Sequence, residues 1–210
     1  MKKLPTAAYD RLVLATNNKH KVTEIQAILR KSGLKLKVLT LDDFPKARPV
    51  VENRATIEGN ARKKAVEVAR RTGVPALADD TGLFIDALGG KPGVYSARFA
   101  GPGCTFQDNN AKVLRMLANV SGARRSATFR CIAALALPNG RVKIAEGRIA
   151  GRIAKELSGV KGFGYDPIFW VAAFRKTFAQ MSQAQKNRVS HRGRAFRQVP
   201  KVWKSLVPRR

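Results

Sequence analysis

Two adjacent aspartates, Asp79 and Asp80, are the residues of this chain whose types and spacing point most directly to chemistry. They follow a short apolar run, residues 76–78, and precede Thr81-Gly82. Paired carboxylates at the end of a strand can hold a divalent metal ion and activate a water molecule. Asp followed by Thr-Gly is also ordinary turn chemistry. The pair alone therefore leaves a catalytic site and a simple turn both open.

Acidic residues are scarce in the rest of the chain. Against 41 Lys and Arg there are 14 Asp and Glu, which gives a formal net charge of +27. Such a charge attracts nucleic acid, anionic membrane surfaces and polyphosphorylated substrates alike. The basic residues run from Lys2 to Arg210 and form no single arm, so they do not indicate a dedicated nucleic-acid patch. Nucleic acid is therefore expected only as a non-specific electrostatic partner.

A second candidate feature is a strand, a polar turn and a helix near the N-terminus. Residues 11–16 are predicted to form a short buried strand. After the turn at 17–20, apolar residues recur on one face of a helix, at Val22, Ile25, Ile28 and Leu29. A helix N-terminus offers backbone N–H groups to anions, and Lys21 adds a positive charge, so a phosphate could bind there. Many α/β proteins have such turns without a ligand, so this signal is weak by itself.

The elements that must position these residues alternate between strands and helices, which predicts an α/β fold. Thr56 is a suitable N-cap for the second helix, and Thr72-Gly73 ends it. Asn139-Gly140 lies between two alternating runs and predicts a hairpin. The predicted strands are 37–41, 76–78, 83–85, 127–133 and 141–145; the further helices are 56–71 and about 109–119; residues 89–95 form a glycine-rich loop.

Length and composition predict one domain over residues 1–210, with residues 1–9 as a flexible basic tail. No run of about 18 apolar residues occurs, so no membrane span or membrane partner is expected. The N-terminus is a poor secretory signal. Cys104 and Cys131 are far apart and lack CxxC spacing, which indicates neither a zinc site nor a disulfide framework. A reducing cytoplasm is the expected location.

Five motifs together resemble the Ham1/RdgB family of inosine triphosphate pyrophosphatases, in the family's order and across nearly the entire chain. The motifs are Thr16-Asn17-Asn18-x-x-Lys21, residues 56–65 (TIEGNARKKA), residues 76–101 (ALADDTGLFIDALGGKPGVYSARFAG), residues 162–169 (GFGYDPIF) and residues 190–195 (SHRGRA).

The resemblance implies hydrolysis of noncanonical purine nucleoside triphosphates, such as ITP, dITP and XTP, to the monophosphate and pyrophosphate. It implies Mg²⁺ as the cofactor and a homodimer as the assembly. The implied fold is α/β, with an elongated, twisted mixed β-sheet, flanking helices, and two lobes around a central groove that holds the active site.

Carried over residue by residue, the resemblance makes Asp80 the general base and a metal ligand, with Asp79 in support. Glu52 matches the acid that precedes the family's helix motif and is the candidate for a second metal carboxylate. Lys64 matches a helix lysine that faces the groove. The substrate-binding residues at the phosphate end are Thr16, Asn17, Asn18, Lys19, His20, Lys21 and Thr81.

The resemblance assigns the base end of the nucleotide to the C-terminal motifs. An aromatic side chain of the Phe-Gly-Tyr-Asp motif would lie against the purine. A 6-keto purine presents an acceptor, so a donor such as Arg192 would accept hypoxanthine and leave adenine unpaired. His191 alone could equally be a structural histidine that caps the next helix. The residues assigned to this end are Phe163, Gly164, Tyr165, Asp166, Lys186, His191 and Arg192.

The chain departs from the family pattern at several positions. Gly59 stands where the family has Glu, Thr81 replaces a Ser, and Asn17 replaces a Gly. Asn tolerates positive φ better than most residues. The loss of an acid at Gly59 is expected to weaken metal binding or turnover. Two alternatives remain: a catalytically weakened member that binds nucleic acid, and a Maf-like nucleotide pyrophosphatase, against which the intact C-terminal motifs argue.

Overall fold

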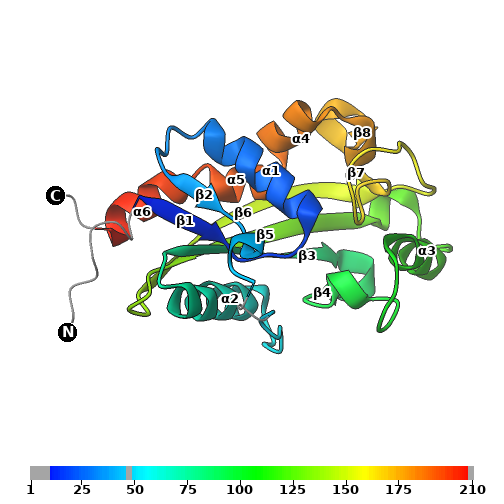
Figure 1. Ribbon diagram of the computed structural model, residues 1–210. Coiled ribbons are helices and arrows are strands. Elements are labelled where there is room, and N and C mark those ends of the chain that lie inside the picture. The colour runs from blue at the N-terminus through cyan, green and yellow to red at the C-terminus, as the bar shows by residue number, and fades with distance from the viewer. Residues whose placement is uncertain (1–9, 46–48, 208–210) are drawn as a thin grey trace. The chain divides into compact units, whose positions relative to one another are not determined.

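The computed structural model describes residues 10–45 and 49–207. The predicted tail at residues 1–9 lies outside this part of the chain. The strands are β1 (Arg11–Leu14), β2 (Lys37–Leu39), β3 (Ala76–Ile85), β4 (Pro92–Gly93), β5 (Ser126–Ala136), β6 (Val142–Ile153), β7 (Phe169–Val171) and β8 (Lys176–Thr177); the α-helices are α1 (Lys19–Arg30), α2 (Ile57–Thr72), α3 (Phe106–Met116), α4 (Gln183–Val189), α5 (His191–Phe196) and α6 (Val199–Leu206) (Figure 1).

These strands form one mixed sheet. Over the described residues its order is β2-β1-β3-β5-β6-β7-β8, with β4 beside β3. β1 pairs in parallel with β2 and β3, whereas β6, β7 and β8 pair antiparallel. Parallel pairs need crossover connections, and α1 and α2 supply them between β1, β2 and β3. The predicted α/β fold with a mixed sheet is confirmed.

The chain divides into two compact units. Among the described residues, unit 1 comprises the chain up to Asp80, residues 131–147 and the chain from Arg192 onwards; unit 2 comprises residues 81–130 and 148–191. The boundaries fall within β3, β5 and β6, and between His191 and Arg192. Each unit is therefore built from separate chain segments. The assignment of residues 1–210 to a single domain stays a prediction.

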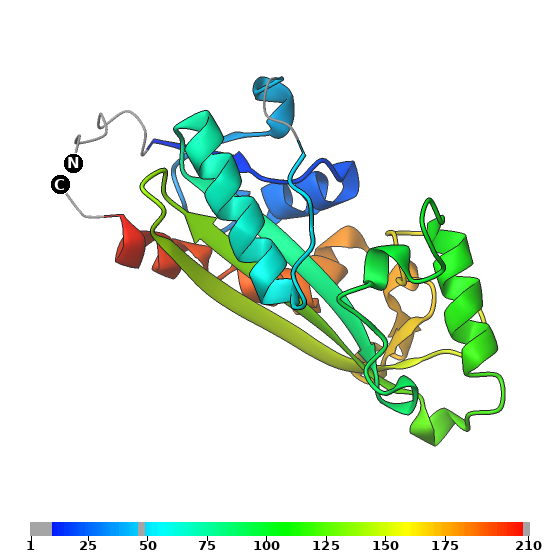
Figure 2. The ribbon, with the colours of Figure 1, turned by 90° about the horizontal axis from the view of Figure 1, so that it is seen from below.

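The core of unit 1 lies between its strands and the helices α1, α5 and α6. Leu12, Leu14 and Leu77 of the strands pack with Ile25 of α1 and Phe196 of α5 in one buried cluster. The helix α2 covers the opposite face of these strands (Figures 1 and 2). Burial on both faces explains why residues 12–14 of β1 and 76–78 of β3 form continuous apolar runs.

Unit 2 has its own apolar core, which is rich in aromatic residues. Phe129 contacts Phe169 with ring centroids 4.6 Å apart, and Phe178 stacks on Phe169 at 5.1 Å. Val113 and Leu117 of the α3 segment are buried in the same cluster. In the described parts of both units, every helix is too short or too polar to cross a bilayer.

Most local predictions hold, with changes at the element ends. The helix predicted at 56–71 is α2, whose N-cap Thr56 accepts a hydrogen bond from the Gly59 N–H, and Gly73 ends it with φ 68°. The two predicted strands around Asp79 and Asp80 form one continuous strand, β3. The helix α3 begins at Phe106, earlier than predicted, because Thr105 and Asp108 form a capping box.

Candidate active site

Asp79 is a fully buried carboxylate that two cations hold. Its Oδ1 lies 2.6 Å from Nζ of Lys21. Its Oδ2 accepts hydrogen bonds from Nε and Nη2 of Arg192, at 3.1 and 3.0 Å. Burial alone would raise the pKa of Asp79, but Lys21 and Arg192 outweigh it and hold the pKa well below its usual range. Asp79 is thus ionised at neutral pH and serves as an anchor.

Asp80, the next residue along β3, has the opposite environment. Its Oδ1 lies 3.6 Å from Nζ of Lys64, and its buried Oδ2 accepts no hydrogen bond. Burial raises the pKa of Asp80 to about 6, against the opposing effect of Lys64 and with a further contribution from Glu52. Successive side chains of a strand point to opposite faces, so the two neighbours meet different partners. Asp80 therefore has a free oxygen and an affinity for protons suited to a base at neutral pH.

Lys64 joins Asp80 to Glu52. Its Nζ lies 2.6 Å from Oε1 of Glu52 and donates to the backbone carbonyl of Asp79 at 2.6 Å. Burial alone would lower the pKa of Lys64, but Asp80 and Glu52 outweigh it and raise the pKa. The helix α2 presents this side chain to β3 because Lys64 lies on its buried face, with Ala61, Ala65 and Val68. The two carboxylates predicted to bind metal therefore share one ammonium group.

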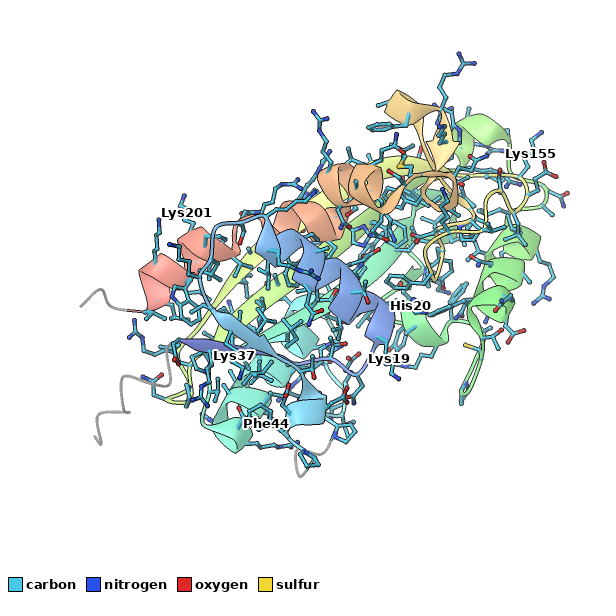
Figure 3. The ribbon with its side chains drawn as sticks, turned by 45° about the horizontal axis from the view of Figure 1, so that its top comes forward. Lys19, His20, Lys37, Phe44, Lys155 and Lys201 are labelled. Atoms are coloured by element: carbon cyan, nitrogen blue, oxygen red, sulfur yellow. The ribbon has the colours of Figure 1, made fainter. Side chains whose placement is uncertain are left out.

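The predicted phosphate-binding turn has the local structure of a helix cap. The Oγ1 of Thr16 accepts from the Asn18 N–H, and the Asn18 side chain accepts from the Lys21 N–H. Lys19 and His20 lie exposed in the first turn of α1 (Figure 3). Asn17 does not adopt positive φ, since Arg175 is the one non-glycine residue of the described chain that does. The tolerance of Asn for that conformation is therefore not used.

Arg192 is buried between two carboxylates, and its predicted contact with the substrate base stays a prediction. It is 2% exposed, and its Nη1 donates to Oε2 of Glu24 at 2.7 Å, in addition to its bonds with Asp79. A guanidinium that binds two buried carboxylates is held in place by them. Through Nε and Nη2 the guanidinium of Arg192 holds Oδ2 of Asp79. Sequence reasoning missed Glu24, although an acid on the apolar face of α1 was a visible signal.

In unit 2 the loop 162–166 is built around a second buried ion pair. Oδ2 of Asp166 lies 2.5 Å from Nζ of Lys186 and also accepts from the Phe163 N–H at 2.8 Å. The Lys186 ammonium lies 4.7 Å from the centroid of the Phe163 ring. A side chain at position 162 would place its Cβ 1.9 Å from the same Asp166 oxygen, so glycine is required there. These contacts fix the backbone beside Phe163.

Two further residues hold the same loop from outside it. Asn110 of α3 donates from Nδ2 to the Gly164 carbonyl at 3.0 Å. The hydroxyl of Tyr165 donates to the Ser96 carbonyl at 2.8 Å, and burial raises the pKa of this tyrosine. Tyr165 is 5% exposed, so it anchors the loop. Neither Asn110 nor Ser96 carried a signal in the sequence, because only the fold brings them to the loop.

His191 and Thr81 complete the predicted residues of unit 2. The buried imidazole of His191 stacks on Phe129, with ring centroids 4.4 Å apart and an interplanar angle of 17°. This packing holds the imidazole of His191 in the core of unit 2, and its contact with the substrate stays a prediction. Thr81 is half-buried and follows Asp80 in β3.

Gly59 lies at the third position of α2. This is where a Glu would complete a capping box with Thr56, since that acid reaches back to the N-cap N–H. A Cβ at this position would lie 2.9 Å from Cβ of Arg54. Arg54 takes up the space beside the glycine, and the weaker metal binding expected from the missing acid stays a prediction.

The model of the Ham1 family matches residues 12–202. The chain belongs to the Ham1 family. A dITP/XTP pyrophosphatase of Desulforamulus reducens is 47% identical over 196 residues, which cover 93% of this chain and 96% of the relative. A dITP/XTP pyrophosphatase of Geobacter sulfurreducens is 50% identical over 186 residues, which cover 89% of this chain and 92% of the relative.

Solved structures of this family have the same fold. A HAM1 protein from Coxiella burnetii has a TM-score of 0.83 and 40% identity, with 93% of this chain and 98% of that chain covered. The Ham1 protein of Staphylococcus aureus has a TM-score of 0.81 and 34% identity, with the same coverage. The similarity extends over nearly the whole chain, as the order of the five motifs predicted.

Proposed function

We propose that this protein is a nucleoside triphosphate pyrophosphatase that cleanses the nucleotide pool of noncanonical purine nucleotides such as ITP, dITP and XTP. The observation that carries the proposal is the contrast between Asp79 and Asp80, one saturated by cations and the other with a buried, unpartnered oxygen. Paired carboxylates whose environments separate their pKa values divide into an anchor and an acid–base group. The names of the two relatives described above support the same reaction.

In the proposed mechanism, Asp80 orients a water molecule and accepts its proton. The water oxygen forms a bond to the α-phosphorus, and the bond from that phosphorus to the bridging oxygen of the β-phosphate breaks. The products are the nucleoside monophosphate and pyrophosphate, and Asp80 then returns its proton to solvent. The raised pKa of Asp80, about 6, is close to the operating pH and suits a general base.

The residues around Asp80 also fit a magnesium ion, which we propose as the cofactor. Asp80 and Glu52 would hold it, since Oδ2 of Asp80 is a buried acceptor that no protein donor uses. Among the described residues no three His, Cys, Asp or Glu side chains gather into a metal-binding group. Mg²⁺ commonly takes one or two carboxylates and completes its shell with waters and substrate phosphates. When bound, it would neutralise negative charge on the phosphate oxygens.

The remaining side chains of unit 1 would bind the triphosphate. Lys21 projects from the first turn of α1, where backbone N–H groups and the helix dipole favour anions. Lys19 and His20 add exposed donors beside it. Asp79 would keep Lys21 extended and in place, because a buried ion pair fixes both partners. Arg192 and Glu24 would support Asp79 from behind, and we assign them this positioning role.

In unit 2, we propose that Phe163 lies against the purine. Lys186 and Asp166 would keep its ring and backbone in place. Gly164 allows close approach of the backbone, since it has φ 64° and no side chain. We further propose that the protein acts as a homodimer in the cytoplasm, with no membrane partner.

The test is a nucleotide panel with product identification. Purified protein is incubated with ITP, dITP, XTP, ATP, GTP and a pyrimidine triphosphate, with Mg²⁺ and with EDTA, and Asp80→Asn serves as the matched inactive control. We expect pyrophosphate from the three noncanonical purines, at least about tenfold lower kcat/KM for ATP and GTP, and no turnover in EDTA. Release of orthophosphate, or a preference for the pyrimidine, would contradict the proposal.

A further inference from the structure

A row of four exposed basic side chains follows the C-terminal helices of unit 1. We call Arg194, Arg197, Lys201 and Lys204 the basic stripe. Arg194 lies in α5, Arg197 in the turn that follows it, and Lys201 and Lys204 in α6. All four are exposed, whereas Ala195, Phe196, Val199 and Trp203 between them are buried in the core. Lys201 projects away from α6 in Figure 3.

The surroundings of the basic stripe add to its positive charge. No Asp or Glu follows Asp166 in the sequence. The adjacent strand β6 contributes Lys143, whose Nζ donates to the Ser205 carbonyl at 3.3 Å. It also contributes one acid, Glu146, whose carbonyl accepts from Nε2 of Gln198 at 2.7 Å. Basic side chains therefore far outnumber acidic ones in this part of the chain.

Two polyanions could neutralise such a stripe, and the packing of α6 distinguishes them. An interfacial helix binds a membrane by burying an apolar face in the lipid. The apolar residues of α6, namely Val199, Trp203 and Leu206, are already buried in the core of unit 1. The helix therefore has basic side chains to offer but no apolar face. This favours the phosphate backbone of a nucleic acid over an anionic membrane.

The dimensions of the stripe also suit a nucleic acid. The helix α6, which carries Lys201 and Lys204, has 8 residues and is about 12 Å long at 1.5 Å per residue. Duplex DNA carries about one phosphate charge per 1.7 Å of its axis, so several phosphates lie within that length. All four members of the stripe are Arg or Lys, so they offer positive charge and hydrogen-bond donors that suit phosphate, and none is an aromatic stacking residue. We propose that the basic stripe binds the phosphate backbone of nucleic acid without reading its sequence.

The experiment measures duplex DNA binding by fluorescence anisotropy as a function of salt. Three proteins are compared: the wild type, a stripe variant with Arg194→Gln, Arg197→Gln, Lys201→Gln and Lys204→Gln, and a matched control with Arg115→Gln, Arg124→Gln, Lys155→Gln and Lys176→Gln. The control also loses two Arg and two Lys, all exposed and all in unit 2. Melting temperature confirms that each variant is folded. Anionic vesicles serve as a second probe.

We expect the stripe variant to bind DNA at least about tenfold more weakly than wild type near 100 mM salt. Its slope of log K against log salt should fall by about 3 to 4, because four phosphate contacts are lost. The control should change Kd less than about threefold. An equal loss in both variants would show that net charge alone attracts DNA and would overturn the proposal. Absence of DNA binding by wild type, or a stripe-dependent affinity for vesicles but not for DNA, would overturn it as well.

Discussion

Each unit buries a carboxylate beside a lysine: Asp80 of β3 in unit 1, and Asp166 of the loop 162–166 in unit 2. The two carboxylates differ in whether an oxygen is left without a hydrogen bond. Oδ2 of Asp166 binds both Lys186 and a backbone N–H. Oδ1 of Asp80 lies 3.6 Å from Nζ of Lys64, and Oδ2 of Asp80 accepts no hydrogen bond. Removing a paired buried carboxylate leaves its partner charge unpaired and destabilises the fold, whereas a buried carboxylate oxygen without a hydrogen bond itself costs stability. The difference indicates that Asp166 positions its loop and Asp80 is kept for chemistry.

The largest expected effect is on turnover at Asp80. Asp80→Asn keeps the size of the side chain but removes the base and a metal ligand, so kcat for ITP should fall by about 1,000-fold or more, or about 4 kcal/mol. Pyrophosphate release under saturating substrate measures it. If the variant keeps more than about a tenth of wild-type kcat, a loss under about 1.4 kcal/mol, Asp80 is not the base.

The stability of the same variant provides the control. Because the folded-state pKa of Asp80, about 6, is above its unfolded value, its protonated form contributes stability that is lost as the pH rises through about 6. Metal-free Asp80→Asn should therefore melt no lower than wild type at pH 8. A clear decrease in its melting temperature would mean that the loss of turnover reflects damage to the fold.

The opposite outcome is expected in unit 2. Asp166→Asn would leave the buried ammonium of Lys186 without its counter-ion, so the free energy of unfolding should fall by about 3 kcal/mol. Urea denaturation of the Asp166→Asn and Asp80→Asn proteins, side by side and without metal, measures the contrast. Equal stability of the two variants would remove the distinction between a positioning and a catalytic carboxylate.

Replacing Lys21 tests whether this residue both binds the substrate phosphates and stabilises the fold through Asp79. Lys21→Ala should raise KM for ITP by about tenfold, because a charge-assisted contact to phosphate is lost. Its melting temperature should decrease as well, because the buried Asp79 would lose one of its two cations. Lys19→Ala, on the same turn and exposed, is the control and should leave the melting temperature unchanged. A stable Lys21→Ala protein would contradict the role of Asp79 as an anchor.

The smallest effect concerns Asn110, which holds the loop from α3. Asn110→Ala removes the hydrogen bond to the Gly164 carbonyl, so Phe163 should be less well placed and KM should rise about threefold, with kcat nearly unchanged. Gln107→Ala, exposed on the same helix, is the control. A decrease in kcat with unchanged KM would show that Asn110 does not act through the base end.

The sequence predicted the local elements well because their signals are local. The cap at Thr56, the stop at Gly73 and the hairpin at Asn139-Gly140 depend on residues a few positions apart. The three C-terminal helices were not predicted, since α4 and α5 are short. The motif resemblance identified the family, but it could not show how the residues of each motif are paired.

Pairing depends on residues that are distant in the chain. Arg192 and Asp79 are 113 residues apart, and Arg192 and Glu24 are 168 apart. A motif names Arg192 as functional, yet its contacts, and hence its role as a clamp, follow from where the fold places α1, β3 and α5. At Gly59 the sequence shows only that an acid is missing. The structure shows that the Gly59 N–H donates to the N-cap Thr56 and that Arg54 lies beside the glycine.

The most direct test of the proposed mechanism is ITP hydrolysis in ¹⁸O-labelled water, with the products analysed by mass spectrometry. If Asp80 activates water for attack on the α-phosphorus, one ¹⁸O atom should appear in inosine monophosphate and none in pyrophosphate. The same distribution should hold for any residual turnover of a Lys21→Ala protein. Label in pyrophosphate, with unlabelled monophosphate, would place the attack on the β-phosphorus and contradict the mechanism.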